Sequence, residues 1–195
     1  MVSIIIVNWN GGEVFRKCLA SLKKIKFKDY ELIVVDNGST DGTQKLATIR
    51  NSENLGFAGG NNQGYQKTRG KYIWLLNNDT LVKPDTLDKL VDYMDKHLDV
   101  GVIQPKIRIM DKPELLDNAG SFLTQSGFLE HWGYLQKDGQ EYSQIKDIFS
   151  AKGACLFTRK NIIEKVGLFD PDFGSYFEET DFCWRVWLFG LKVQY

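Results

Sequence analysis

Short apolar runs alternate with helix-forming segments along the first half of the chain, and this alternation restricts the fold more than any other feature. The runs Val2–Val7, Glu31–Val35 and Tyr72–Leu76 have the apolar character of strands buried on both faces. Between them, Glu13–Lys24 carries apolar residues at helical spacing, and Pro84 favours a helix start. Repeated strand–helix–strand units predict an α/β fold with an open, mainly parallel sheet and helices on both faces.

The remaining predicted elements continue this pattern into the second half. Gly190 is expected to end the last helix, because glycine favours the conformation that terminates helices. The predicted ranges are helices over Ser39–Ile49, Gly60–Thr68, Asp85–Lys96, Asn161–Val166 and Thr180–Phe189, strands over Val100–Ile109 and Ala154–Thr158, and an extended piece near Asn51–Asn54.

The length of 195 residues is enough for one domain with its own core. The middle segment, Asp111–Ser150, is rich in Gly, Gln, Ser and aromatic residues and predicts hairpins and loops that form one wall of a cleft. The last residues, Leu191–Tyr195, resemble the start of a strand, so we expect a further C-terminal segment in the full protein.

Charge and cysteine content exclude several classes of protein. The 25 basic and 25 acidic residues balance, so no overall field would hold nucleic acid, and an anionic ligand must be met locally, for example by a metal ion. Cys18, Cys155 and Cys183 lack zinc-site spacing and predict reduced thiols in a cytoplasmic protein. Val2–Val7 is too short for a signal peptide and lacks a basic leader, and no stretch is long enough to span a bilayer.

Polar side chains follow three of the predicted strands. The exits carry Asn8 and Asn10, then Asp36 and Asn37, then Asn77–Asn78–Asp79. Ligands of open parallel sheets bind beyond the carboxyl ends of the strands, so the three exits are expected to share one crevice. Ordinary turn composition is the alternative explanation for any single exit.

Two of these carboxylates suit a nucleotide ligand. Asp36 can accept a hydrogen bond from the ring N–H of uracil or thymine, or from a ribose hydroxyl. Asp79 can serve as an oxygen ligand for Mg²⁺ or Mn²⁺. Gly60 and Asn61 belong to a segment of small residues and amides that permits close backbone approach at a helix start, where N–H groups favour anions. A plain glycine-rich turn is the alternative.

A further acidic cluster precedes the last predicted helix. Glu178 and Glu179 are adjacent, so one is expected to enter the cleft while the other serves the helix N-terminus. The surrounding aromatic residues should raise a carboxylate pKa toward the working range of a general base. Asp181 and Arg185 are spaced to pair on one helix face.

Two common nucleotide-binding motifs are absent. The sequence after the first strand, Asn10–Gly11–Gly12, is not a dinucleotide fingerprint, and the chain contains no phosphate-binding loop of the Gly-x-x-x-x-Gly-Lys type. A dehydrogenase or a P-loop hydrolase is therefore disfavoured.

Taken in order, these motifs resemble those of family 2 glycosyltransferases, in particular the rhamnosyltransferase-like subset. The matching segments are Val2–Gly11, Val34–Thr43, Asn54–Asn62, Leu75–Asp79 and Phe177–Asp181. The resemblance implies a GT-A fold in one domain, with a nucleotide-binding half over about residues 1–110 and an acceptor-binding half over about 111–195.

The resemblance also implies roles for individual residues. Asp36 would contact the nucleotide base, and Asn77–Asn78–Asp79 would replace the metal-binding Asp-x-Asp motif, with Asp79 carrying most of the metal contact because Asn77 ligates weakly. Glu178–Glu179 matches a Glu–Asp pair that holds the catalytic base. We assign the base to Glu179, whose side chain is one methylene longer than the family's aspartate.

The implied activity is that of an inverting glycosyltransferase. A sugar would pass from a nucleotide-diphosphate donor, dTDP-rhamnose or a UDP-sugar, to a hydroxyl of a glycan or a lipid-linked saccharide acceptor. A divalent metal and a carboxylate base would assist, in cell-envelope polysaccharide biosynthesis at the cytoplasmic face of the membrane, with peripheral association if the acceptor is lipid-linked. A sugar-phosphate nucleotidyltransferase and a non-catalytic nucleotide-sugar-binding module are the alternatives. The oligomeric state is not indicated.

Overall fold

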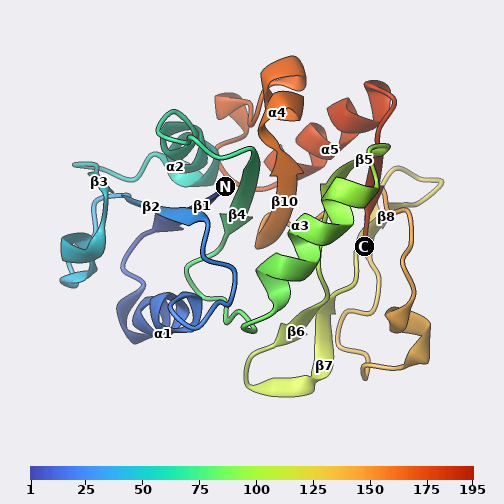
Figure 1. Ribbon diagram of the computed structural model, residues 1–195, viewed down its shortest axis with the longest axis horizontal. Coiled ribbons are helices and arrows are strands. Elements are labelled where there is room, and N and C mark those ends of the chain that lie inside the picture. Colours follow the sequence, from blue (N-terminus) through green and yellow to red (C-terminus); the bar gives the residue numbers. More distant parts are fainter.

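The computed structural model describes residues 1–195 and is organised around one seven-stranded sheet (Figure 1). Strand β10 is antiparallel to both of its neighbours, and the other pairs are parallel, which agrees with the predicted mainly parallel sheet. The spatial order is β11 (Lys192–Gln194), β5 (Val100–Ile103), β10 (Cys155–Arg159), β4 (Tyr72–Leu76), β1 (Val2–Asn8), β2 (Tyr30–Asp36) and β3 (Ile49–Arg50).

Five α-helices cover the two faces of this sheet. Helices α1 (Gly12–Leu22) and α3 (Thr86–Lys96) pack on one face, and α2 (Gly56–Tyr65), α4 (Lys160–Val166) and α5 (Glu178–Leu188) pack on the other. Three short 3₁₀ turns, η1 (Thr43–Leu46), η2 (Gln140–Ser143) and η3 (Pro171–Phe173), lie in the connections. The prediction of helices on both faces is confirmed.

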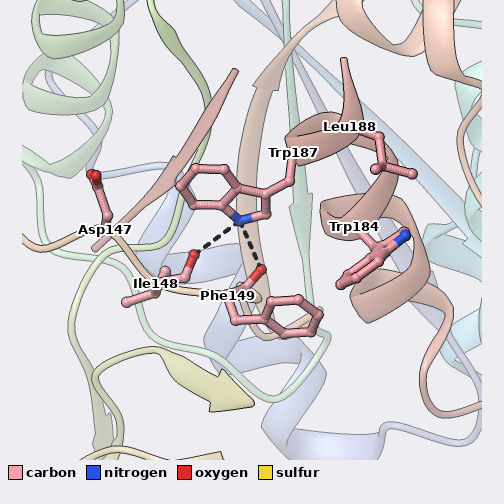
Figure 2. Close-up of a pocket in the computed structure, with 6 residues that line it drawn as sticks. All are labelled: Asp147, Ile148, Phe149, Trp184, Trp187 and Leu188. Carbon is pink, nitrogen blue, oxygen red and sulfur yellow. Dashed lines mark hydrogen bonds between the residues drawn. The ribbon is translucent and has the colours of Figure 1, made fainter. Parts of the chain in front are cut away.

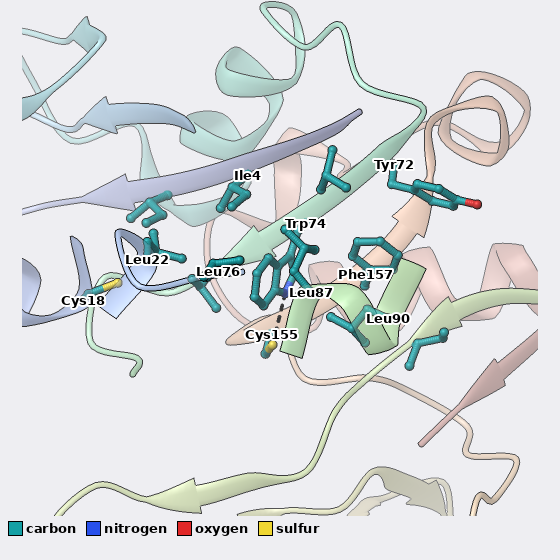
Figure 3. Packing of buried hydrophobic residues seen from close by; sticks show 14 of the residues in the cluster. Ile4, Cys18, Leu22, Tyr72, Trp74, Leu76, Leu87, Leu90, Cys155 and Phe157 are labelled. Atoms are coloured by element: carbon teal, nitrogen blue, oxygen red, sulfur yellow. Dashed lines mark hydrogen bonds between the residues drawn. The ribbon is translucent and has the colours of Figure 1, made fainter. Parts of the chain in front are cut away.

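The alternation of side chains along the central strands produces two cores. Ile4 and Trp74 face α1 and α3, whereas their chain neighbours Ile5 and Leu75 face α2 and α5. Figure 3 shows the first core, in which Trp74 Nε1 donates to Cys155 Sγ at 3.2 Å. The mostly apolar character of these strands follows from the burial of both of their faces.

The middle segment forms the hairpins that its composition predicted. Strands β6 (Ile107–Ile109) and β7 (Lys112–Asn118) pair with each other, as do β8 (Ser121–Leu123) and β9 (Leu129–His131). The β6–β7 hairpin extends beyond the sheet below α3 in Figure 1.

Two predicted elements are wrong. The helix expected over Ser39–Ile49 is only the short turn η1, because Asp41 Oδ1 accepts the Thr43 N–H and the chain then extends as β3 against β2. The extended piece expected at Asn51–Asn54 is this β3, and it lies two residues earlier.

The strand expected over Val100–Ile109 is divided into β5 and β6. Pro105 has no N–H for a sheet ladder, and the Gln104 side chain is buried, where it donates to Asn118 Oδ1 and accepts the Lys152 N–H. This interruption turns the chain out of the main sheet.

All three cysteines are buried and free of disulfides. No helix combines the length and the apolar character that crossing a bilayer requires.

Candidate active site

The polar exits of β1, β2 and β4 are joined by hydrogen bonds. Asn78 Nδ2 donates to Asn8 Oδ1 at 3.0 Å, and Asn8 Nδ2 donates to Asp36 Oδ1 at 2.9 Å. Asn8 Nδ2 also lies 2.9 Å from Thr43 Oγ1. The parallel register places Asn8 opposite Asp36. The three exits therefore meet at one edge of the sheet, and the crevice that they were expected to share stays a prediction.

Asp36 lies beneath this edge. Its carboxylate is 1% exposed, and its second oxygen accepts the Ser39 N–H at 2.8 Å. Asn37 is equally buried and donates to Asn54 Oδ1 and to the Gly56 carbonyl. These side chains hold the connections that follow β2, and the contact between Asp36 and a nucleotide base remains a prediction.

Asn10 lies nearer to solvent and links two loops. It is exposed and adopts a left-handed backbone, with φ of 49°. Its Oδ1 accepts the Thr40 N–H, and its own N–H donates to Ser39 Oγ. The Gly12 N–H donates to Asp41 Oδ2 at 2.8 Å. The loops after β1 and β2 therefore form one connected rim.

The glycine-rich segment differs from its prediction, because α2 begins at Gly56 and not at Gly60. Gly60 therefore lies inside the helix, where an added Cβ would come within 2.7 Å of Val7 Cγ1. Asn61 is buried and donates to the Phe57 carbonyl. Gly60 packs the helix against β1 and Asn61 bonds within its own helix, so neither residue lies at the helix start, and a binding role for them stays a prediction.

The first turn of α2 already has protein partners. The Ala58 N–H donates to the Gly174 carbonyl at 3.1 Å, and the Phe57 N–H donates to Ser175 Oγ at 3.4 Å. Asn62 exchanges two hydrogen bonds with the backbone of Phe169. The chain that leads into α5 is therefore held against α2.

The exit of β4 opens onto a large cavity of about 880 Å³. Asn77 and the exposed Asp79 lie at this cavity, and the Asn77 N–H donates to the Ala154 carbonyl at 3.0 Å. Helix α3 and the β6–β7 hairpin form the walls. Cationic side chains in the lining are Lys83, Lys89, Lys106, Arg108 and Lys152.

Asp79 fits a divalent cation only in part. No group of three or more His, Cys, Asp or Glu side chains is arranged to hold a metal ion in this chain. Mg²⁺ commonly uses one or two protein carboxylates and completes its shell with waters and substrate phosphates. Asp79, which lines the cavity together with Asn77, fits that kind of shared site and not a site built by the protein alone.

Glu178 and Glu179 occupy the first turn of α5, which begins two residues earlier than predicted. Tyr176 and Phe177, immediately before them, both have left-handed backbones, with φ of 75° and 68°. Bulky side chains rarely adopt this conformation. The two carboxylates therefore follow directly after two residues with a strained backbone.

Both carboxylates are buried with an unpartnered oxygen. Oε2 of Glu178 and Oε2 of Glu179 have no hydrogen-bond partner. Burial raises the pKa of Glu178 to about 7, with a smaller contribution from the charge of Glu179. Burial also raises the pKa of Glu179, and the Gly153 N–H partly offsets this rise. Glu178 is 4% exposed, and Glu179 as a whole residue is partly exposed.

The segment Lys152–Ala154 connects the two acidic regions. Lys152 and Ala154 line the 880 Å³ cavity, whereas a Cβ added to Gly153 would lie 3.1 Å from Phe57 and 3.7 Å from Glu179 Cδ. The cavity is lined by Asp79 but not by Asp36 or Glu179. This cavity is therefore not a single pocket around all of the predicted site residues.

The predicted pair of Asp181 and Arg185 is confirmed, with Arg185 Nη2 2.7 Å from Asp181 Oδ2. Arg185 also donates to the carbonyls of Val166, Gly167 and Leu168. This pair fixes α5 to the end of α4 and is structural.

A second pocket, of about 440 Å³, lies on the side of α5 (Figure 2). Trp184 and Leu188 line it from the helix, and Trp187 Nε1 donates to the carbonyls of Ile148 and Phe149. None of the predicted site residues lines this pocket.

Sequence reasoning missed two charged residues near the site. Lys152 Nζ lies 2.6 Å from Asp117 Oδ2, and both residues line the larger cavity. Lys152 precedes Gly153–Ala154–Cys155, a segment that contacts the site, and that position is its only sequence signal. Asp117 lies in a hairpin strand with no local signal.

Comparison with known proteins identifies a family. The model described as glycosyl transferase family 2 matches residues 3–167. A hexosyltransferase of low-salt glycan biosynthesis from Haloferax volcanii, Agl10, is 24% identical over 94% of this chain and 61% of its own length.

Solved structures show the same fold. TarS from S. aureus, in complex with UDP-GlcNAc, superposes with a TM-score of 0.72 at 16% identity, over 99% of this chain and 55% of that one. The mannosyltransferase PcManGT from Pyrobaculum calidifontis, in complex with GDP-Man and Mn²⁺, gives a TM-score of 0.71 at 17% identity, over 98% of this chain and 53% of that one. The chain thus spans little more than half the length of these proteins.

Proposed function

This chain belongs to glycosyl transferase family 2, and from that premise we propose that it transfers a sugar from a nucleotide-diphosphate donor to an acceptor hydroxyl with inversion. The observation that carries the proposal is the unpartnered Glu179 Oε2, buried at the start of α5 beside Gly153. The next residue, Ala154, is bonded to Asn77 at the exit of β4. Gly153 and Ala154 thus connect the proposed base, Glu179, to the exit of β4, which is proposed to hold the donor diphosphate.

The proposed reaction is a single displacement. Glu179 accepts the proton of the acceptor hydroxyl, whose oxygen forms a bond to the anomeric carbon while the bond from that carbon to the diphosphate oxygen breaks. The nucleoside diphosphate leaves on the opposite face, so the configuration inverts. Asp79 would hold a divalent cation, which would supply charge stabilisation to the leaving nucleoside diphosphate.

The state of the glutamate pair supports this assignment. A general base works best when its pKa lies near the working pH. Burial raises the pKa of both carboxyls toward that range. Glu178 is the more enclosed of the two and lies beside Glu179 in the same helical turn. We propose that Glu179 receives the proton and that Glu178 acts on it only through the electrostatic interaction between the two carboxyls.

The donor and acceptor are proposed at the level of chemical class. The structures that resemble this chain contain UDP-GlcNAc in one case and GDP-Man with Mn²⁺ in another. These support a nucleotide-sugar donor with Mg²⁺ or Mn²⁺, and we propose a UDP-sugar or dTDP-rhamnose. We propose a glycan or a lipid-linked saccharide as the acceptor, and the name of Agl10 connects that protein with glycan biosynthesis.

The test is donor turnover with and without metal. The protein is incubated with UDP-GlcNAc, UDP-glucose, dTDP-rhamnose or GDP-mannose, with Mn²⁺ or with chelator, and release of nucleoside diphosphate is followed. We expect metal-dependent release from one of these donors, and NMR of the sugar freshly released to water, before mutarotation, should show the inverted anomer. Retained configuration would contradict the single displacement.

A pair of matched variants tests whether the metal-dependent release requires Asp79. Asp79→Ala should lose metal-dependent release, whereas Asp88→Ala, an exposed carboxylate of α3 that does not line the cavity, should behave as wild type. Two outcomes would favour the alternatives. Formation of a nucleotide sugar from a nucleoside triphosphate and a sugar phosphate would indicate a nucleotidyltransferase. Donor binding without any turnover would indicate a binding module.

A further inference from the structure

A cluster of cations lies on α1 and the turn that follows it. The stretch 14–28 contains six basic residues and no acidic residue, although the whole chain is neutral. All six side chains are exposed. They are Arg16, Lys17, Lys23, Lys24, Lys26 and Lys28.

These cations have no carboxylate partners. None of the six forms an ion pair, and the Lys28 ammonium donates only to the Ile25 carbonyl. The nearby acids are engaged elsewhere, because Asp29 pairs with the chain N-terminus and Asp85 pairs with Lys89. Asp85 also interacts with Lys26 at longer range, so nearby acids offset the positive potential of this surface only in part.

The cluster adjoins the larger cavity. The Lys26 N–H donates to the Pro84 carbonyl at 2.9 Å, which places the turn after α1 beside the segment that leads into α3 (Figure 1). Lys83, the residue before Pro84, is exposed and lines the cavity that Asp79 also lines. The basic surface thus continues from the turn after α1 to the rim of the cavity.

We propose that the surface formed by Lys23, Lys24, Lys26, Lys28 and Lys83 binds the anionic headgroups of a lipid bilayer. A flexible row of ammonium groups suits a plane of phosphates, and each lysine near such a surface strengthens binding by about fivefold. Docking on this surface would bring the rim of the cavity close to the bilayer.

A membrane fits this surface better than a nucleic acid does. Single-stranded nucleic acids are held by aromatic side chains on which bases stack, together with cations. Within the turn and the strand it leads to, Phe27 and Tyr30 pack against the first core and are not free to stack. The chain also has no net positive charge.

The test is co-sedimentation with vesicles at roughly 0.1 M salt. Wild-type protein should bind vesicles of phosphatidylcholine that contain about one third phosphatidylglycerol, should not bind pure phosphatidylcholine, and should dissociate at high salt. Replacing Lys23, Lys24, Lys26 and Lys28 together by alanine should reduce the partition coefficient by roughly 10²–10³-fold.

A control variant removes the same charge elsewhere. It replaces four exposed lysines without ion pairs by alanine, namely Lys45, Lys67, Lys137 and Lys165, and should bind vesicles as wild type does. Equal loss in both variants would show a net-charge effect and would overturn the proposal. If the first variant does not fold by circular dichroism, the pair Lys23→Gln and Lys24→Gln should still lower the partition by roughly 25-fold.

A further arm uses a single-stranded oligonucleotide with the same proteins. Oligonucleotide binding that depends on these lysines, together with no binding to anionic vesicles, would overturn the membrane proposal. None of these measurements requires sugar transfer, so the proposed surface and the proposed function can fail separately.

Discussion

The exits of the strands and the start of α5 use polar groups in opposite ways. In the network of Asn8, Asp36 and Asn78, each side chain named has a hydrogen-bond partner inside the protein. At the start of α5, Glu178 and Glu179 each keep a buried oxygen without a partner. The first arrangement stabilises one geometry, and the second keeps acceptors available for a ligand.

The difference extends to the backbone. The network lies at the ends of regular, paired strands, whereas the glutamates follow two consecutive left-handed residues, Tyr176 and Phe177. Left-handed backbone at non-glycine residues costs on the order of 1–3 kcal/mol each and persists where surrounding structure enforces it. Here the loop before α5 is held by α2, through Gly174 and Ser175. Side chains with satisfied hydrogen bonds and carboxylates with unpartnered oxygens are thus found in two different regions of the molecule.

The largest expected effect is the loss of turnover when Glu179, one of the two glutamates with an unpartnered oxygen, is replaced. Glu179→Gln should lower turnover by roughly 10²–10⁴-fold, because the amide cannot accept the acceptor proton. Donor binding, measured by calorimetry, should be nearly unchanged. The exposed Glu130→Gln serves as a matched control and should keep wild-type turnover. Wild-type turnover of Glu179→Gln would remove this residue from the proposed role.

The next effect concerns stability at the strand exits. Asp36→Ala leaves the Ser39 N–H without its carboxylate partner, and each buried group left unsatisfied costs about 1–3 kcal/mol. We expect a loss of roughly 2–3 kcal/mol of unfolding free energy in urea titrations. Asp88→Ala should change it by less than about 0.5 kcal/mol. If Asp36→Ala is as stable as wild type and loses only donor binding, then Asp36 acts on the ligand directly.

The third prediction sharpens the role of Asp79. Because the protein supplies few metal ligands, Mn²⁺ alone should leave the thermal midpoint unchanged, whereas Mn²⁺ with UDP should raise it. At a ligand concentration of about 100 Kd the gain is about 2.7 kcal/mol, roughly 5–10 °C for a chain of this size. Asp79→Ala should lose this shift. An equal shift with Mn²⁺ alone would indicate a site that the protein completes by itself.

The smallest expected effect is the contribution of Glu178 to the pH dependence of stability. The pKa of Glu178 is about 7 in the folded protein and 4.5 when unperturbed, so the folded state binds more protons between these values. Stability should therefore fall as pH rises from about 4.5 through about 7, by roughly 1–3 kcal/mol. Glu178→Gln should flatten this dependence in urea titrations at successive pH values. A wild-type slope in the variant would show that another group is responsible.

Several elements were predictable because their signals are local. Strands β1, β2 and β4 carry apolar side chains toward both buried faces, and α1 shows helical spacing, so neither assignment depends on distant residues. The gathering of Asn8, Asp36 and Asn78 also followed from the sequence, because parallel strands end at the same edge.

Other features depend on residues far apart in the chain. Helix α2 begins at Gly56 because Gly174 accepts the Ala58 N–H, and the strand after Val100 stops at Gln104 because Asn118 and Lys152 bind its side chain. A window of neighbouring residues contains none of these partners.

The sequence by itself determined which residues form the main strands and which polar side chains follow them, since periodicity and chain direction act over a few residues. Only the tertiary structure decided that Asp36 is enclosed and that Glu179 retains an unpartnered oxygen. Both outcomes depend on desolvation and on hydrogen-bond partners, and these are supplied by segments that meet only when the chain has folded.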